Sequence, residues 1–239
     1  MKTWIAGGLL ATSLTIAPLA NAALVDTDWK DAGDGLATLH EETGIEWLKL
    51  YNTLDNSIEE ALSQTGEGGL YEGWRLATVS EIRDLIYYLG SANSNIANNI
   101  DTLNYQVSLS YTSTWAGEWR EALGRTYYVD GDRVLSYGLA LDDEGNELWF
   151  GNRRMFSNGT QYFNLNREVS QLSYNPADQG KWGVFLVSDG GTTLSSQLDP
   201  TLNINNANAP INSVSTPLSA LGALLMLGLG LNRRKWATA

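Results

Sequence analysis

The 239-residue chain contains no cysteine and only one histidine, His40. The absence of cysteine excludes a disulfide framework, a thiol nucleophile and zinc-finger ligation, and a Ser-His-Asp triad would have to use His40. Positive charge is also scarce, because 15 lysine and arginine residues face 27 aspartate and glutamate residues, a formal net charge of −12. A chain with this balance repels nucleic acid phosphates, so we expect no nucleic-acid partner.

Residues 1–22 have the three-part order of a secretory signal peptide. Lys2 supplies a positive start, residues 4–19 are mostly apolar, and Ala20-Asn21-Ala22 places small residues where signal peptidase reads the chain. The pattern predicts a signal helix that signal peptidase removes, and export of the rest of the chain. The alternative is a buried N-terminal helix.

A second apolar segment lies near the C-terminus and ends in a basic cluster. Residues 218–231 carry no charge, and Arg233, Arg234 and Lys235 follow shortly after them. Counted from 217 to 236, a helix would be about 30 Å long, close to the hydrocarbon thickness of a bilayer. The positive-inside rule places the basic cluster in the cytoplasm and the preceding chain outside it. We therefore expect a C-terminal transmembrane helix, with a buried core helix as the alternative.

Pro217, the Gly- and Leu-rich run and the cluster Arg233, Arg234 and Lys235 together resemble the PEP-CTERM sorting signal of Gram-negative bacteria. The resemblance implies recognition by an exosortase, a membrane protease that cleaves the signal and passes the protein to the surface or the medium. This chain has Ser215-Thr216-Pro217 in place of the Pro-Glu-Pro triplet. An uncleaved tail would instead remain as an inner-membrane anchor.

Between these ends, the composition divides the chain into a folded part and a linker. Residues 190–216 are rich in Ser, Thr, Asn and Gly, and their apolar residues are scattered. Such a segment favours a flexible polar linker. Residues 23–189 remain as one domain, which is long enough to bury a core of its own.

Local patterns within residues 23–189 predict a compact α+β domain with two early helices and short antiparallel strands. Ser57 with Glu60 and Thr78 with Glu81 form two capping boxes, which predict helices at 57–66 and 78–90. Turn residues at 130–131 and 142–146 predict two hairpins, and 91–101 reads as an Asn-rich loop. The expected strands are 44–50, 127–129, 133–137, 138–141, 147–150 and 182–187.

Three segments of this domain carry a second resemblance. They are Thr-Gly-Ile-Glu-Trp at 43–47, Gly-Trp-Arg-Leu-Ala-Thr at 73–78 with Glu81 and Leu85, and Gly-Val-Phe-Leu-Val at 183–187. Together they are similar to the Lcl-type C-terminal domain, a bacterial extracellular family with a C-type lectin-like fold. In that family, a Trp-Ser-Ser run often lies where this chain has Tyr-Thr-Ser-Thr-Trp at 111–115. Gly73 and Ala77 replace the family's Asp and Pro.

Trp74, Arg75 and Trp115 are the candidate ligand-binding residues, because sugars stack on aromatic rings and both tryptophans lie at positions that are compared with the Lcl-type family. The alternative is architectural. Trp74 would then pack in a small core, with its indole N–H bound to a backbone carbonyl, and Arg75 would form a partly buried ion pair with Glu81.

Asp142, Asp143 and Asn146 are the candidate calcium ligands, because residues 142–147 are the densest group of oxygen donors in the chain. Calcium is the one cofactor that the sequence suggests. The spacing does not match an EF-hand, and an exposed hairpin turn is the alternative interpretation.

The sequence thus predicts an exported bacterial protein of the cell envelope or extracellular matrix, with a non-catalytic module that binds polysaccharide. No catalytic residue is assigned, because the chain lacks a recognisable pair of nucleophile and base. One alternative is an envelope glycoside hydrolase that works through two carboxylates. The other is a purely structural surface protein.

Overall fold

The computed structural model describes residues 24–110, 112–129, 131–169 and 181–202. The expected signal peptide and the expected transmembrane segment, with Pro217, Arg233, Arg234 and Lys235, lie outside the described residues. Within the described ranges, no helix is long and apolar enough to span a bilayer.

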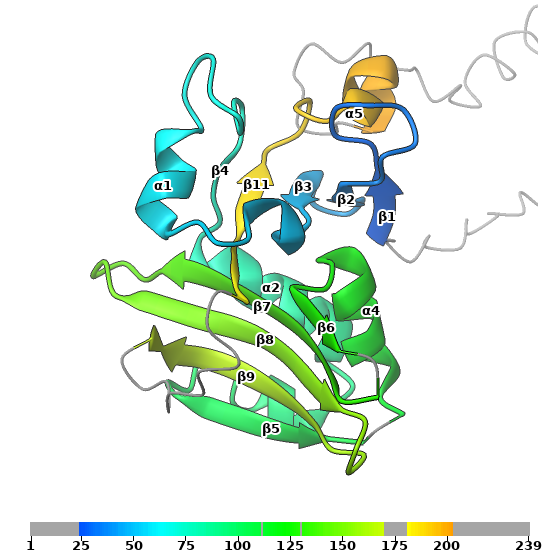
Figure 1. The fold of residues 1–239 in the computed structure, drawn as a ribbon, viewed down its shortest axis with the longest axis vertical. Helices are drawn as coiled ribbons and strands as arrows, with labels where there is room; N and C mark the ends of the chain where they lie inside the picture. The colour runs from blue at the N-terminus through cyan, green and yellow to red at the C-terminus, as the bar shows by residue number, and fades with distance from the viewer. Residues whose placement is uncertain (1–23, 111, 130, 170–180, 203–239) are drawn as a thin grey trace, which may run out of the picture.

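The smaller of two sheets contains both the first and the last strands of the described chain. It has five antiparallel strands in the order β1-β2-β3-β11-β4. They are β1 (Leu24–Thr27), β2 (Ala37–His40), β3 (Ile45–Leu48), β4 (Arg75–Leu76) and β11 (Leu186–Ser188). The helices α1 (Ile58–Ser63) and α5 (Leu194–Leu198) lie beside this sheet (Figure 1).

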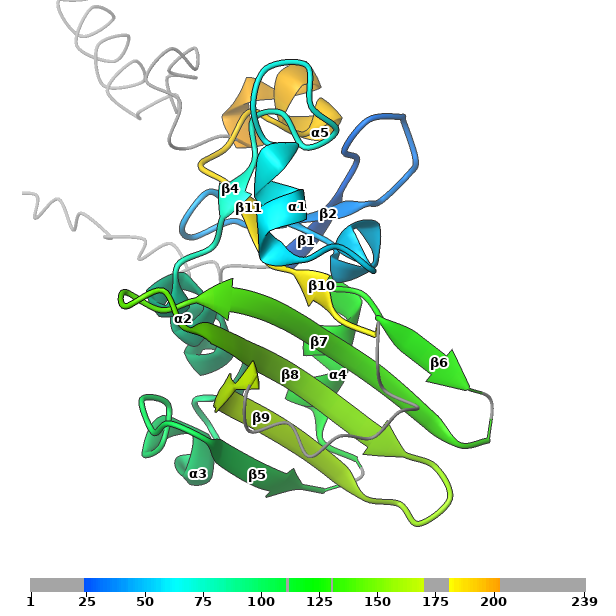
Figure 2. The ribbon, with the colours of Figure 1, turned by 60° about the vertical axis from the view of Figure 1, so that its left-hand side comes forward.

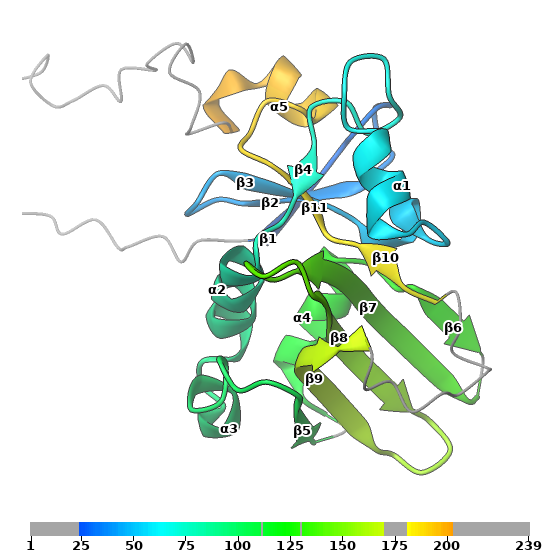
Figure 3. The same ribbon diagram turned by 90° about the vertical axis from the view of Figure 1, so that its left-hand side faces the viewer.

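The larger sheet has the order β10-β7-β8-β9-β5, and β6 pairs with β7. Its strands are β5 (Tyr105–Leu109), β6 (Tyr127–Val129), β7 (Arg133–Leu141), β8 (Glu147–Met155), β9 (Gln161–Glu168) and β10 (Gly183–Val184). The helices α2 (Val79–Gly90) and α4 (Thr114–Ala122) cover one of its faces, as Figures 2 and 3 show. The described part of the chain also contains three shorter helices: α3 (Ser94–Ala97) and the 3-10 turns η1 (Leu50–Thr53) and η4 (Pro200–Leu202).

The main core lies between α2, α4 and the covered face of the larger sheet. Trp119 of α4 is fully buried there, with its ring centroid 4.9 Å from that of Phe163 and 6.0 Å from that of Phe185. Its indole N–H donates to the carbonyl of Ser136 at 3.3 Å. Aromatic contacts of this kind stabilise a core beyond the area that they bury, so α4 is held firmly against the sheet.

The predicted strand at 182–187 joins the two sheets. Val184 pairs in parallel with β7, whereas Leu186 and Val187 lie antiparallel in the smaller sheet. The chain changes sheets at Phe185, whose amide donates to Leu139 and whose carbonyl accepts from Ala77. The buried ring of Phe185 fixes this crossing point in the main core.

The α+β class and the capped helices are confirmed. Both capping boxes are formed, by Ser57 with Glu60 and by Thr78 with Glu81. The hairpins β6–β7 and β7–β8 also form. The predicted strands at 133–137 and 138–141 are one strand, β7, because Gly138 continues the ladder opposite Phe150.

Several elements were not predicted from the sequence. Part of the expected loop at 91–101 is α3, and the strands β1, β2, β5 and β9 and the helix α4 had no predicted counterpart. Their apolar residues are too few for a clear periodic pattern, and their pairing partners lie far away in the sequence.

The expected linker at 190–216 requires a correction for its first part. Residues 190–202 fold against the domain as α5 and η4, and the side chains of Thr193 and Ser196 are buried. Both hydroxyls donate to the carboxylate of Glu46, a fully buried residue of β3. The polar composition predicts flexibility, but in the folded chain the hydroxyl groups of Thr193 and Ser196 supply hydrogen bonds to the buried carboxylate of Glu46. The domain therefore extends past Asp189, and residues 203–216 lie outside the described chain.

Candidate functional site

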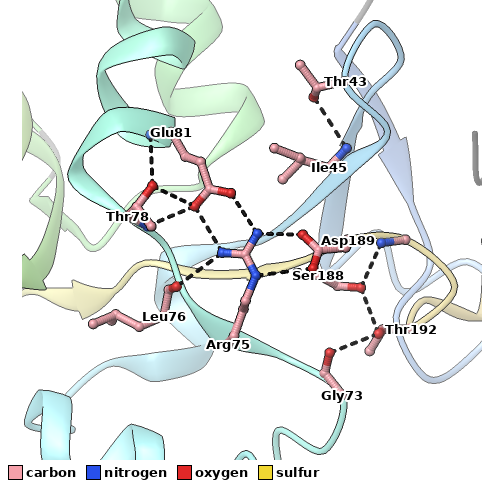
Figure 4. A network of polar contacts seen from close by, with 11 residues as sticks. Thr43, Ile45, Gly73, Arg75, Leu76, Thr78, Glu81, Ser188, Asp189 and Thr192 are labelled. Atoms are coloured by element: carbon pink, nitrogen blue, oxygen red, sulfur yellow. Dashed lines mark hydrogen bonds and ion pairs between the residues drawn. The ribbon is translucent and has the colours of Figure 1, made fainter. Parts of the chain in front are cut away.

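Arg75 links three segments of the chain rather than facing open solvent. Its guanidinium donates to both carboxylate oxygens of Glu81, at 2.9 and 2.6 Å, and to Asp189 after β11 (Figure 4). Glu81 also accepts from the amide of Thr78, so one ion pair joins β4 to the capped start of α2. The predicted ion pair between Arg75 and Glu81 is confirmed, and its geometry is that of a structural clamp.

The two candidate tryptophans lie in different parts of the core. Trp74 is buried against Trp29, whereas Trp115 packs at 4.8 Å from Phe163 in the main core. The predicted carbonyl partner of the Trp74 indole is absent, because its nitrogen is buried without a hydrogen bond to any described residue. The architectural interpretation therefore describes both rings better than ligand stacking does.

The ion pairs of Arg75 with Glu81 and Asp189 should make the stability of the fold depend on pH in the acidic range. Burial raises the pKa of Glu81, but its hydrogen bonds from Arg75 and Thr78 outweigh this effect and leave the pKa below the ordinary 4.5. The hydrogen bond from Arg75 holds the pKa of Asp189 below the ordinary 3.8. Carboxylates with depressed pKa values in the folded state stabilise it above their ordinary pKa values. That contribution is lost as the pH falls through the depressed values.

We expect Arg75→Leu to lower the free energy of unfolding by about 1 kcal/mol at pH 7. As the pH falls from the ordinary to the depressed pKa values of Glu81 and Asp189, the free energy of unfolding should decrease less in the variant than in the wild type. Urea unfolding at a series of pH values measures both effects. Arg75→Lys, which keeps the charge but not the two-armed contact, is the control. If the free energy of unfolding changes with pH in the same way in the wild type and in Arg75→Leu, these ion pairs do not determine the acid sensitivity of the fold.

Asp142, Asp143 and Asn146 form the turn of the β7–β8 hairpin, which confirms the alternative interpretation of an exposed turn. The carboxylate of Asp142 accepts from the amides of Glu144 and Asn146 and from the side-chain amide of Asn146. The hydrogen bond from the Asn146 side chain is the largest cause of a lowered Asp142 pKa. In the described part of the chain, no three acidic or histidine side chains are grouped to hold a metal ion. Calcium binding at this turn stays a prediction.

A pocket that the sequence did not indicate lies between α4 and the ends of β6, β7 and β8. Its volume is about 450 Å³, within the range of small-ligand sites. It is lined by Thr112, Ser113, Thr114, Gly117, Arg120, Glu121, Arg125, Tyr128, Val134, Arg154 and Phe156. The segment before the candidate Trp115 thus contributes to a pocket, although the Trp115 ring itself is in the core.

Arginines dominate the charge of this pocket. Arg120 is only 8% exposed, and its Nη1 donates to the side-chain carbonyl of Gln161 at 3.0 Å and to that of Asn152. Both partners are neutral amides. Among the described residues, Arg120 forms no ion pair and its Nε and Nη2 make no hydrogen bond. Arg120 is therefore a buried cation without a carboxylate partner in the described chain.

Two further arginines reinforce this positive charge. The guanidinium carbon of Arg125 is 5.9 Å from the ring centroid of Tyr128, and that of Arg154 is 5.4 Å from the ring centroid of Phe156. Burial, followed by repulsion from Arg154 and Arg125, lowers the Arg120 pKa to about 10. The side chain is still protonated at neutral pH, and a nearby anion would offset the lowering of its pKa.

A second hollow, which borders α4 and β1, has acidic side chains in its lining. Its lining includes Asp26, Glu118 and Glu121 together with Tyr88. The carboxylate of Asp26 lies 2.8 Å from the ammonium group of Lys49. Glu121 lines both hollows, so the two adjoin at this residue of α4.

Sequence reasoning missed the arginine pocket because its lining comes from α4 and from the strands β6, β7 and β8, which meet only in the folded chain. The sequence does place Arg120 next to Trp119. The apolar and charged residues around this pair alternate irregularly, however, so no helical pattern can be recognised there. In comparisons with models of known families, with curated proteins and with solved structures, the chain matches none.

Proposed function

We propose that this protein is an exported bacterial protein of the envelope or extracellular matrix whose domain binds polysaccharide without catalysis. The observation that carries the proposal is the pocket beside α4, where Tyr128 and Phe156 lie among guanidinium groups. Aromatic rings and fixed polar groups are what a saccharide site requires, because sugar rings have apolar faces and polar edges. The signal-like residues 1–22 support export.

The C-type lectin-like fold belongs to the same proposal. The three segments that carry the resemblance meet in the smaller sheet, where Val187 of β11 pairs with Trp47 of β3 and with Arg75 of β4. Segments that lie about 30 and 110 residues apart therefore form one continuous unit. This convergence supports a common architectural role for the three motifs.

The C-terminal residues define the route of export in this proposal. Exosortase cleaves the segment at 217–236 and releases the protein to the surface, and the uncleaved form is an inner-membrane intermediate. Signal peptidase and exosortase are thus the processing partners. The cluster of Arg233, Arg234 and Lys235 marks the cytoplasmic end of the segment.

The test uses protein isolated from the membrane and medium fractions of the native cell. Its intact mass should lack residues 1–22 in both fractions and also the tail after about residue 217 in the medium. The medium form is then applied to a polysaccharide and glycan array, where we expect binding. A membrane form alone, lacking only residues 1–22, would contradict exosortase processing. If the protein binds no glycan or polysaccharide on the array, polysaccharide binding is contradicted and a structural surface protein is favoured. If it hydrolyses a polysaccharide, the glycoside hydrolase alternative is favoured.

A further inference from the structure

We infer that the arginine pocket beside α4 recognises a carboxylate group, so that the polysaccharide it binds is acidic and contains uronic acid residues. This inference rests on the proposed function and specifies its ligand. It is carried by the juxtaposition of Arg120, Arg125 and Arg154 in a single hollow with Tyr128 and Phe156.

The first step of the argument is the cost of burying Arg120. An ionised side chain that is removed from water is unfavourable unless it is paired or coordinated, and neutral amides compensate only part of this cost. Arg120 has Asn152 and Gln161 as its only hydrogen-bond partners in the described chain. A ligand that brings a negative charge to Nε and Nη2 would complete the site.

The second step is the sign of the local field. The whole chain carries a formal charge of −12, and yet, among the described residues, three cations and one carboxylate, that of Glu121, line this pocket. At physiological ionic strength, charges act over about 8 Å. An anionic group inside the pocket is therefore attracted locally, although the chain as a whole is acidic.

The third step is the shape of the binding groups. A guanidinium group presents parallel N–H donors that match the two oxygens of a planar carboxylate. The rings of Tyr128 and Phe156 lie edge to face, with centroids 6.3 Å apart, and they offer apolar surface next to the cations. A sugar ring that carries a carboxylate combines both requirements in one residue, because its ring contacts the aromatic surface while its carboxylate reaches the arginines.

The test is titration calorimetry on the secreted form with an oligogalacturonate, compared with the same oligomer after its carboxyl groups are reduced to alcohols. We expect reduction of the carboxyl groups to weaken binding at least tenfold. Arg125→Gln, at an exposed position, should weaken binding of the acidic oligomer about tenfold and leave the reduced oligomer unaffected. Arg120→Gln should weaken it at least as much in protein that keeps the wild-type circular dichroism spectrum.

Lys30→Gln is the matched control, because it removes one positive charge from an exposed residue outside the pocket. It should leave the affinity unchanged. Equal binding of both oligomers, with no effect of Arg125→Gln, would overturn the carboxylate assignment while polysaccharide binding stands. An equal loss in Lys30→Gln and Arg125→Gln would also overturn it, because net charge alone would then explain the effect. Absence of binding to every saccharide would overturn the proposed function together with this inference.

Discussion

Replacing Trp119 by alanine is expected to lower the free energy of unfolding by about 3–5 kcal/mol. The side chain is fully buried between α4 and the larger sheet, and it contacts the rings of Phe163 and Phe185. Alanine would leave a cavity at the centre of the main core and remove the hydrogen bond from the indole nitrogen to the carbonyl of Ser136. A domain with a total stability of about 5–15 kcal/mol would lose a large part of it.

Urea unfolding followed by circular dichroism measures this loss. Trp119→Phe separates the two contributions, because it keeps an aromatic ring and removes only the hydrogen bond and part of the volume. Tyr87→Ala removes an aromatic ring from α2 at a position that is 51% exposed, and we expect a change within about 0.5 kcal/mol. A similar small change for Trp119→Ala would mean that α4 does not pack against the sheet as described.

Replacing Glu46 by alanine is expected to cost about 3 kcal/mol, because several buried donors would lose their acceptor. The carboxylate of Glu46 accepts from the amides of Thr192 and Thr193 at 3.1 and 3.3 Å and from the Thr193 hydroxyl at 2.5 Å. Ser196 donates to the same carboxylate. The substitution should also release residues 190–202, which hydrogen exchange would detect as lost amide protection in α5.

Glu59→Ala is the matched control, since Glu59 is an exposed glutamate of α1 and its loss should change stability by less than about 0.5 kcal/mol. Truncation of the chain after Asp189 removes the donors of Thr192, Thr193 and Ser196 and leaves the Glu46 carboxylate without them, either buried or exposed to water. It should therefore be destabilised at least as much as Glu46→Ala. Wild-type stability of the truncated chain would restore the sequence-based view that residues 190–202 are a linker.

The helices that could be predicted are those whose start is specified by neighbouring residues. Ser57 with Glu60 and Thr78 with Glu81 satisfy backbone donors only three residues away, so the residues themselves define the cap. The hairpin turn at 142–146 is equally local, with Asp142 accepting from the amide of Asn146. Helix α4 escaped prediction because its Ser113 cap makes no such side-chain hydrogen bond, and its burial depends on a sheet formed later in the chain.

The same distinction applies to the candidate sites. The pair Arg75 and Glu81 was foreseeable, since six residues separate them and the helix start brings them together. At the calcium candidates Asp142, Asp143 and Asn146, the local pattern indicated the turn that forms, because Asp142 accepts from the amides of Glu144 and Asn146. The contacts of Arg120 with Asn152 and Gln161 span 32 and 41 residues, and no local pattern indicates them.

The sequence by itself determined the charge, the absence of thiol chemistry, the two capped helices and the hairpin turns, because each depends on composition or on neighbours within a few residues. Only the tertiary structure decided that Glu46 holds the segment after Asp189 and that three arginines share one pocket. Both sites join groups from distant segments. A charge at either site requires hydrogen-bond or ionic partners only after folding has removed it from water, because water solvates it in the unfolded chain.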